Sequence, residues 1–353
     1  MLILAIIAFC VIIIIHEMGH FFAAKACGIK VDEFSLGMGP RIFVKQGKET
    51  LYTVKLLPIG GSVQMGEDEE NSDPRSFRNK PVWQRIIVLV AGPLMNLILG
   101  VIICSITLIV SGRVVTSEIG GFRGDEPVSS QFLQAGDEIV EINGLSIWSS
   151  MDISYALQNS AQKASANAEF ITYDFKVRRD GEIVTLNDVK FAATLGENGK
   201  TGVVLDFYVI AHKTDFGNVF VYSFKEAATY GRLVWISLID LISGTYGLND
   251  LSGPVGVVSA ITQTASASTD MRINFTNLLS MIALITINLG IFNLLPVPAL
   301  DGSRILFLII ELFRRKPMKP EHEGIVHFIG FAALMILMVV VTFNDIVKLF
   351  TGG

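Results

Sequence analysis

The sequence is poor in charged residues and in cysteine. Only 17% of its 353 residues are Asp, Glu, Lys or Arg, against about 25% in an ordinary soluble domain. The apolar residues, 51% of the chain, come in long blocks, which excludes a purely soluble protein. Three cysteines cannot form a disulfide framework. A net charge of −5 without a long basic run argues against nucleic acid as a partner.

Four apolar segments are long enough to cross a bilayer as helices, which takes about 20 residues. They predict a multi-pass membrane protein. The second segment has no charge from Ile86 to Ser111, and the third has none from Thr276 to Leu300. The four predicted spans are residues 1–26, 82–111, 276–302 and 324–347.

The basic residues predict how the chain lies in the membrane. Lysines and arginines gather in residues 27–81 and 303–323, whereas only Lys348 follows the last span. The positive-inside rule therefore places both loops in the cytoplasm and both termini outside it. The long segment between the second and third spans is then extracytoplasmic.

The polar segments also show order. Residues 27–81 contain two alternating stretches around Gln46-Gly47-Lys48 and predict a membrane-associated β-hairpin region. In residues 112–212 the run Gly136–Gly144, a short helix from Met151 and a hairpin at Asp180-Gly181 resemble an α+β PDZ domain. Residues 213–275 predict an amphipathic helix and a linker, with the helix lying on membrane lipid. A PDZ domain here could bind an extended peptide or act only as a steric cap.

One sequence motif points to chemistry. His16-Glu17-Met18-Gly19-His20 places two histidines at i and i+4, so both imidazoles lie on one helix face and can reach one metal ion. Glu17 lies beside them, positioned to take a proton from a metal-bound water. Ionisable groups inside a membrane helix are costly and normally mark function. The alternative is a buried structural His–Glu network.

A hydrolytic zinc site needs a third protein ligand. Asp301 fits best, because it ends the third predicted span on the same side as the two histidines. His212, His322 and His327 are the weaker candidates. Two intramembrane asparagines, Asn96 and Asn293, could bind a substrate backbone or tie helices together.

Motifs spread over nearly the whole chain resemble those of the site-2 protease family of intramembrane zinc metalloproteases. They are His16-Glu17-x-x-His20, Gly37-x-Gly39-Pro40, Pro58-x-Gly60-Gly61-x-Val63-x-Met65, Gly92-Pro93-x-x-Asn96, Ser252-Gly253-Pro254-Val255-Gly256 and Asn293-x-x-Pro296-x-Pro298-x-Leu300-Asp301-Gly302. Four spans with one PDZ domain resemble the bacterial branch that cleaves anti-sigma factors and remnant signal peptides.

The resemblance implies an α-helical enzyme of the bacterial cytoplasmic membrane that cuts single-span membrane proteins within their transmembrane segments. His16, His20 and Asp301 would hold Zn²⁺, Glu17 would be the catalytic base, and Asn293 and Asn96 would contact the substrate. The hairpin region would pair with the unwound substrate as a strand. Two other classes of protein remain as alternatives: a non-catalytic membrane PDZ adaptor and a metal carrier.

Overall fold

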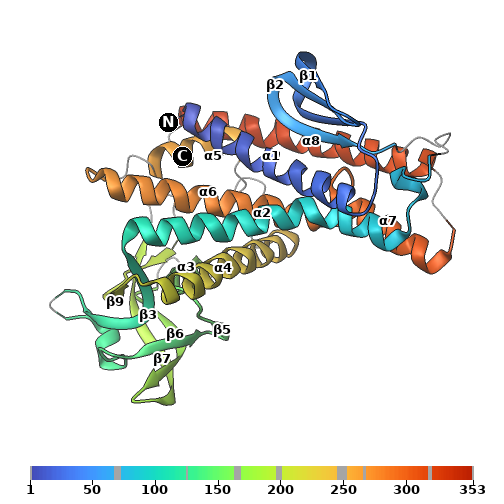
Figure 1. The fold of residues 1–353 in the computed structure, drawn as a ribbon. Helices are drawn as coiled ribbons and strands as arrows, with labels where there is room; N and C mark the ends of the chain where they lie inside the picture. Colours follow the sequence, from blue (N-terminus) through green and yellow to red (C-terminus); the bar gives the residue numbers. More distant parts are fainter. Residues whose placement is uncertain are drawn as a thin grey trace. The chain divides into compact units, whose positions relative to one another are not determined.

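The structure is a computed structural model that describes residues 2–66, 73–124, 126–162, 168–195, 201–244, 253–264, 268–316 and 320–351. Figure 1 shows the order of the elements along the chain. The helices are α1 (Leu2–Ala26), α2 (Val82–Ser111), α3 (Ser150–Gln162), α4 (Phe216–Ile242), α5 (Pro254–Thr264), α6 (Met271–Leu294), α7 (Asp301–Arg314) and α8 (Pro320–Thr351). The strands are β1 (Glu33–Gln46), β2 (Leu51–Gln64), β3 (Arg113–Phe122), β4 (Glu138–Ile142), β5 (Leu145–Ser146), β6 (Phe170–Arg179), β7 (Glu182–Leu195), β8 (Thr201–Val203) and β9 (Phe207–Lys213).

The chain divides into two compact units. One unit runs from Cys104 to Thr229, and the other comprises the residues before and after it. The inserted unit is built on a sheet with strand order β8-β7-β6-β4-β3-β9, with β5 paired to β4. Its core includes the fully buried rings of Tyr173, Phe175 and Phe191. The expected short helix and the Asp180-Gly181 hairpin are both present, as α3 and β6–β7.

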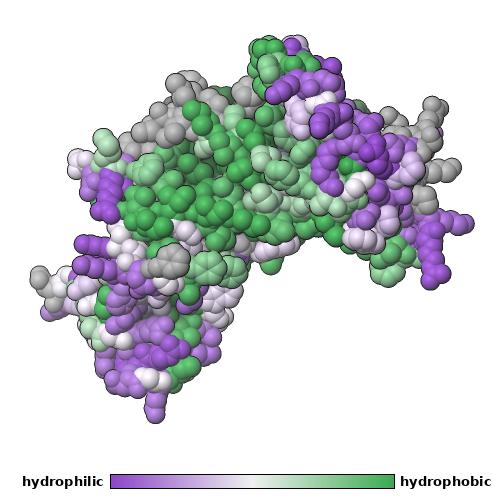
Figure 2. All heavy atoms as spheres, in the orientation of Figure 1, coloured by the Kyte–Doolittle hydropathy of each residue, from purple (hydrophilic) through white to green (hydrophobic). Residues whose placement is uncertain are grey.

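The other unit contains the apolar helices. Among the described residues, four helices are long and apolar enough to cross a membrane: Ile7–Ala26, Val82–Ser111, Met271–Leu294 and Glu321–Lys348. Their outer faces expose large apolar side chains, such as Ile98 and Ile102 on α2 and Phe328 and Ile336 on α8. Figure 2 shows the resulting hydrophobic surface in green. Water would not tolerate so broad an apolar surface, whereas lipid would cover it.

The expected hairpin is part of a more elaborate sheet, because β1 and β2 both fold back on themselves. The hairpin pairs 41–46 with 51–55 in antiparallel register, and Gly47 donates its N–H to the Thr50 carbonyl at 2.9 Å. Residues 33–36 then lie between 51–54, to which they run parallel, and 61–64, to which they run antiparallel. The four pieces thus lie in the order 61–64, 33–36, 51–54, 41–46.

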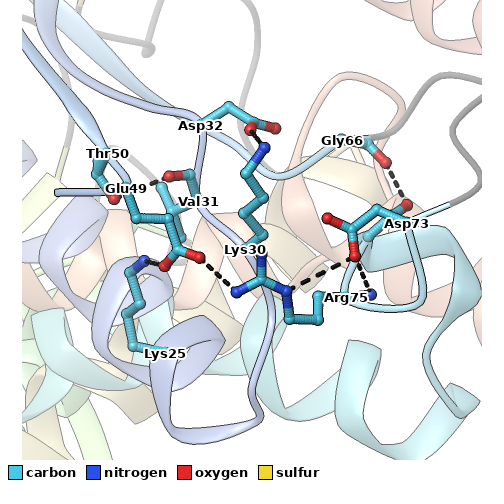
Figure 3. Close-up of polar contacts among 10 residues, drawn as sticks. Lys25, Lys30, Val31, Asp32, Glu49, Thr50, Gly66, Asp73 and Arg75 are labelled. Carbon is cyan, nitrogen blue, oxygen red and sulfur yellow. Dashed lines mark hydrogen bonds and ion pairs between the residues drawn. The ribbon is translucent and has the colours of Figure 1, made fainter.

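Charged side chains fasten this sheet to the end of α1 and to the segment around Arg75 (Figure 3). Glu49 accepts hydrogen bonds from Lys25 Nζ and from Arg75 Nη1, both at 2.5 Å. Arg75 also faces Asp73 at 3.6 Å. The hydrogen bond from Lys25, with that from Arg75, holds the pKa of Glu49 below its ordinary value. Because these groups are partly exposed, the network orients the sheet more than it stabilises it.

Glu33 is the buried charge of the sheet. Its side chain is 7% exposed, accepts from the Thr53 hydroxyl at 2.7 Å and pairs with Arg41 at 2.5 Å. Burial alone would raise its pKa, but the hydrogen bonds from Thr53 and Arg41 and the charges of Arg41 and Lys55 bring the pKa below its ordinary value. The ionised carboxylate therefore joins both folded-back strands.

Replacing Glu33 should loosen the sheet in a pH-dependent way. Glu33→Ala leaves the buried Thr53 hydroxyl without its partner, which costs about 1–3 kcal/mol of stability. A carboxyl with a lowered pKa stabilises the fold above its unfolded pKa and loses that contribution as pH falls through the folded pKa. Thermal unfolding in detergent should therefore separate wild type from Glu33→Ala at neutral pH, and the gap should shrink in acid. A gap that does not change with pH would contradict the role given to the charge.

Two sequence expectations about the C-terminal third were wrong. The third span ends with α6 at Leu294, so Asp301 does not end that span but begins α7. Residues 303–323, expected to be a loop, are helical in α7 up to Arg314 and again from Pro320. Of the basic run Arg314–Lys316, Arg314 is the last residue of α7, and Arg315 and Lys316 follow the helix. Residues 67–72 of the expected cytoplasmic loop lie outside the described residues. So do residues 245–252, which include Ser252, and 265–267 of the expected linker.

Candidate metal centre

The two motif histidines lie on α1, inside the candidate span Ile7–Ala26. His16 is 8% exposed and His20 is 7% exposed. Their Nε2 atoms are 3.2 Å apart, and the rings meet edge to face. Residues four apart lie on one helix face, so the helix itself brings both nitrogens to one point.

Asp301 comes to the same point from the start of α7, directly after the non-helical segment between α6 and α7. After α6, the Leu300 N–H bonds to the Val297 carbonyl at 3.1 Å, which forms a β-turn with Pro298 in its second position. Ala299 occupies the third position with φ +76°, a conformation typical of a type II turn. On α8, His327 Nδ1 accepts the Ala299 N–H at 3.1 Å. The turn lies between the end of α6 at Leu294 and the start of α7 at Asp301.

The three side chains form a compact triangle. Asp301 Oδ2 lies 3.1 Å from His16 Nε2 and 3.3 Å from His20 Nε2. A tetrahedral Zn²⁺ with bonds of about 2.0–2.1 Å would space its ligands by about 3.3 Å. Asp301 Oδ2 is also buried without a hydrogen-bond partner in the described part of the chain. A carboxylate oxygen without a hydrogen-bond partner that faces two imidazole nitrogens fits a metal site. Among the described residues, no other group of three such side chains could hold a metal ion.

Helix α2 lies behind the histidines and orients both rings. The Val88 carbonyl is 2.8 Å from His20 Nδ1, so this nitrogen carries the proton and Nε2 keeps its lone pair. Asn96, two turns further along α2, has its Nδ2 atom 3.3 Å from His16 Nδ1. Partners of this kind orient the histidines of metal sites and set their tautomer.

Two glycines permit this close approach of α1 and α2. A Cβ on Gly19 would overlap the Ala91 carbonyl oxygen, and a Cβ on Gly92 would overlap His20 Nε2. Small residues at such positions let membrane helices pack backbone to backbone. The Gly92-Pro93-x-x-Asn96 motif thus has a steric function at its first residue.

An ion pair connects α2 to the helix that carries Asp301. Both terminal nitrogens of Arg85 donate to the Glu311 carboxylate. The side chains are only 9% and 15% exposed. Arg85, Val88, Gly92 and Asn96 follow one another at spacings of three and four, so a single face of α2 contacts both histidines and α7.

Glu17 lies next to the triangle and against strand β2. On α1 it is three residues before His20, hence on a neighbouring part of the same face. A Cβ added to Gly61 would lie 2.6 Å from Glu17 Cγ and 3.2 Å from Glu17 Oε1. The 61–64 piece of the sheet therefore passes directly over the glutamate.

The other predicted residues lie in different settings. Asn96 is fully buried and has His16, rather than an open surface, next to its amide. Asn293 is half-buried in the last turn of α6. His327 bonds the turn before Asp301, His322 lies in the first turn of α8, and His212 lies in β9 near Glu118.

Sequence reasoning missed several groups that shape the site. Gly61 and Gly92 stand in quoted motifs, and a glycine beside a helix that carries ligands could have signalled the close approach. Arg85 and Glu311 are 226 residues apart, so no local pattern connects them. The Val88 carbonyl leaves no signal at all, because every residue carries one.

Comparison with known proteins identifies a family of zinc metalloproteases. Residues 4–337 match the peptidase family M50. A putative zinc metalloprotease of Clostridium acetobutylicum is 35% identical over 98% of this chain and 97% of its own. The regulator of sigma-W protease RasP of Bacillus subtilis is 32% identical over 98% of both chains, and a probable protease of Enterococcus faecalis is 30% identical over the same shares. The chain therefore belongs to peptidase family M50, the site-2 proteases, and is an intramembrane zinc metalloprotease.

Proposed function

We propose that this enzyme hydrolyses a peptide bond within the transmembrane segment of single-span proteins of the anti-sigma factor or remnant signal peptide type. The proposal rests mainly on the position of the triangle of His16, His20 and Asp301 among the apolar helices. Two of its corners are buried side chains on α1, a helix apolar enough to cross the membrane. A substrate bond must therefore come to membrane depth to meet them.

In this proposal His16, His20 and Asp301 hold the zinc ion. When bound, zinc lowers the pKa of its water to about 7 and polarises a carbonyl oxygen. Glu17 accepts a proton from the attacking water and delivers it to the leaving amine. Its position within the helical turn that ends at His20 suits both transfers.

The sheet supplies a binding edge for an unwound substrate. Among the described residues, the 61–64 piece pairs only with 33–36, so its other edge offers free backbone donors and acceptors. A transmembrane helix satisfies its own backbone and must unwind before it can be attacked. An extended substrate paired to this edge would lie beside Glu17. Asn293, at the end of α6, would hold the strand from the other side.

Gly61→Ala should separate catalysis from metal binding. The new methyl group would push Glu17 from its place, and a displacement of about 1 Å can lower the rate about 100-fold. We expect kcat to fall by roughly that factor while zinc content is unchanged. Ser62→Ala is the matched control: it removes only a 2.9 Å hydroxyl contact with Ser35 and should stay close to wild type. Equal activity of Gly61→Ala and wild type would refute the contact.

The inserted unit would act outside the cytoplasm. We assign residues 112–212 to a PDZ domain and 213–275 to an amphipathic helix on the outer lipid surface and a linker. Both termini would lie outside, with the active site near the cytoplasmic side. Exposed Phe220, Phe224 and Ile239 on α4 support contact with lipid. Domain and helix together would admit substrates whose outer part has already been removed.

Deleting residues 113–211 tests this filter. The shortened enzyme should cleave full-length substrates that the intact enzyme rejects, because the steric obstacle is gone. Cleavage of pre-trimmed substrate should continue, which controls for damage to the membrane unit. Unchanged selectivity would contradict the filter and leave peptide binding as the domain's use.

The proposal as a whole is tested by cleavage of a purified single-span protein with the full-length enzyme in detergent. Mass spectrometry of the products should place the cut inside the transmembrane segment, and Asp301→Asn should abolish it with loss of zinc. A cut only outside the segment would overturn the intramembrane assignment. Zinc binding with no cleavage of any single-span protein would instead favour the adaptor or the carrier.

A further inference from the structure

The amide of Asn96 is unusual in its surroundings. The side chain is 0% exposed, its Nδ2 lies 3.3 Å from His16 Nδ1, and its Oδ1 has no hydrogen-bond partner in the described part of the chain. A buried amide oxygen without a partner is costly, by about 1–3 kcal/mol. Native interiors rarely leave such an atom unpaired.

The chemistry of His16 supplies the missing partner. Its Nε2 points to His20 Nε2 and Asp301 Oδ2, so Nε2 must present a lone pair if it is to bind a metal. A neutral imidazole then carries its proton on Nδ1. With Nδ2 of Asn96 facing this nitrogen, two N–H groups would oppose each other. A half-turn of the amide exchanges Nδ2 for Oδ1 within the same volume.

We infer that Asn96 is a positioning residue whose Oδ1 accepts the Nδ1–H of His16 and so fixes the tautomer that leaves Nε2 free for zinc. The inference rests on the proposed ligand set and gives Asn96 a role different from substrate binding. One hydrogen bond then gives a partner both to Asn96 Oδ1 and to the Nδ1–H of His16.

The second histidine shows the same arrangement. His20 Nδ1 donates to the Val88 carbonyl at 2.8 Å, two turns before Asn96 on the same face of α2. Each histidine thus has one acceptor on α2, a backbone carbonyl for His20 and a side-chain amide for His16. Only the second acceptor depends on the side chain, which is why position 96 requires a particular residue.

Three variants of the full-length chain test the inference through zinc affinity, measured by competition with a chelating dye. Asn96→Leu keeps a side chain branched at Cγ but has no acceptor, and should weaken zinc binding about 10- to 100-fold. Asn96→Asp has only acceptors and should bind zinc at least as tightly as wild type. Asn288→Leu, a half-buried asparagine on α6 without a described contact to the three ligands, is the control and should be unchanged.

Wild-type affinity in Asn96→Leu, or a loss in Asn96→Asp as large as in Asn96→Leu, would overturn the inference. So would an equal loss in Asn288→Leu, because the effect would then be a general response of the helices. His16→Ala separates a failure of the proposed ligand set from a failure of the role given to Asn96. If this variant binds zinc normally, the ligand set itself is wrong.

A spectroscopic test needs no variant at position 96. NMR of the zinc-loaded wild-type chain with isotope-labelled histidine should show His16 bound through Nε2, with a slowly exchanging proton on Nδ1. His20 should give the same pattern and serves as the internal reference. A metal-bound His16 that lacks the Nδ1 proton, or binds through Nδ1, would refute the role of Asn96. Two histidines without metal contact would refute the ligand set instead.

Discussion

Glu17→Gln should retain one zinc ion per chain and lose cleavage. Glutamine has nearly the same shape and still fills the space against Gly61, so the sheet and α1 should not move. It cannot accept a proton, however, and removing a general base typically costs about 10²–10⁴ in rate. The experiment compares zinc content and the cleavage rate of a single-span substrate for the two purified proteins.

The two readouts separate the possible roles of Glu17. Retained zinc with lost cleavage identifies a base that is not a ligand. Loss of zinc would mean that Glu17 binds the metal, which contradicts the triangle of His16, His20 and Asp301. A fully active variant would remove Glu17 from the chemistry and reopen the alternatives without catalysis.

Gly92→Ala should strongly weaken zinc binding although residue 92 is not a ligand. The added methyl group would occupy the position of His20 Nε2, the atom that faces His16 and Asp301. Moving the backbone of α2 away from α1 would open the close packing of Ala91 against Gly19. The imidazole must therefore turn away, and we expect at least a 100-fold loss of zinc affinity, as large as the strongest effects known for groups behind metal ligands.

Gly324→Ala is the matched control for this steric prediction. Gly324 lies in a candidate span, and an added Cβ would have nothing within 4 Å. Alanine is also the better helix former, so this variant should be at least as stable as wild type and bind zinc normally. Wild-type zinc affinity in Gly92→Ala would show that α1 and α2 are not in such close contact at His20.

Much of the fold follows from local patterns. The four apolar runs correspond to α1, α2, α6 and α8, and the Asp180-Gly181 turn connects β6 and β7. These features depend on residues that are neighbours in sequence, through hydrophobic length and turn geometry. The motif histidines share that property, because a helix places residues four apart on one face.

The errors concern places where distant segments decide the local structure. Asp301 was expected at the end of a span, whereas the turn at Pro298 and Ala299 starts a new helix there, with α8 bonded to the turn through His327. Residues 27–81 were expected to contain a hairpin, and the structure adds residues 33–36 and 61–64 to the same sheet, with Glu33 bonded to Thr53 of the hairpin. Neither event has a signal within the segment itself.

The sequence by itself determined the chemistry available to this protein. An apolar first span carrying His16, Glu17 and His20 already requires a buried metal or an ion network, because isolated charges are too costly in lipid. Only the tertiary structure decided how that chemistry is assembled. Asp301 comes to 3.1–3.3 Å of the histidines, α2 orients both rings, and Gly61 brings a strand over Glu17. These contacts join residues far apart in the chain, so they form only when the helices and the sheet pack together.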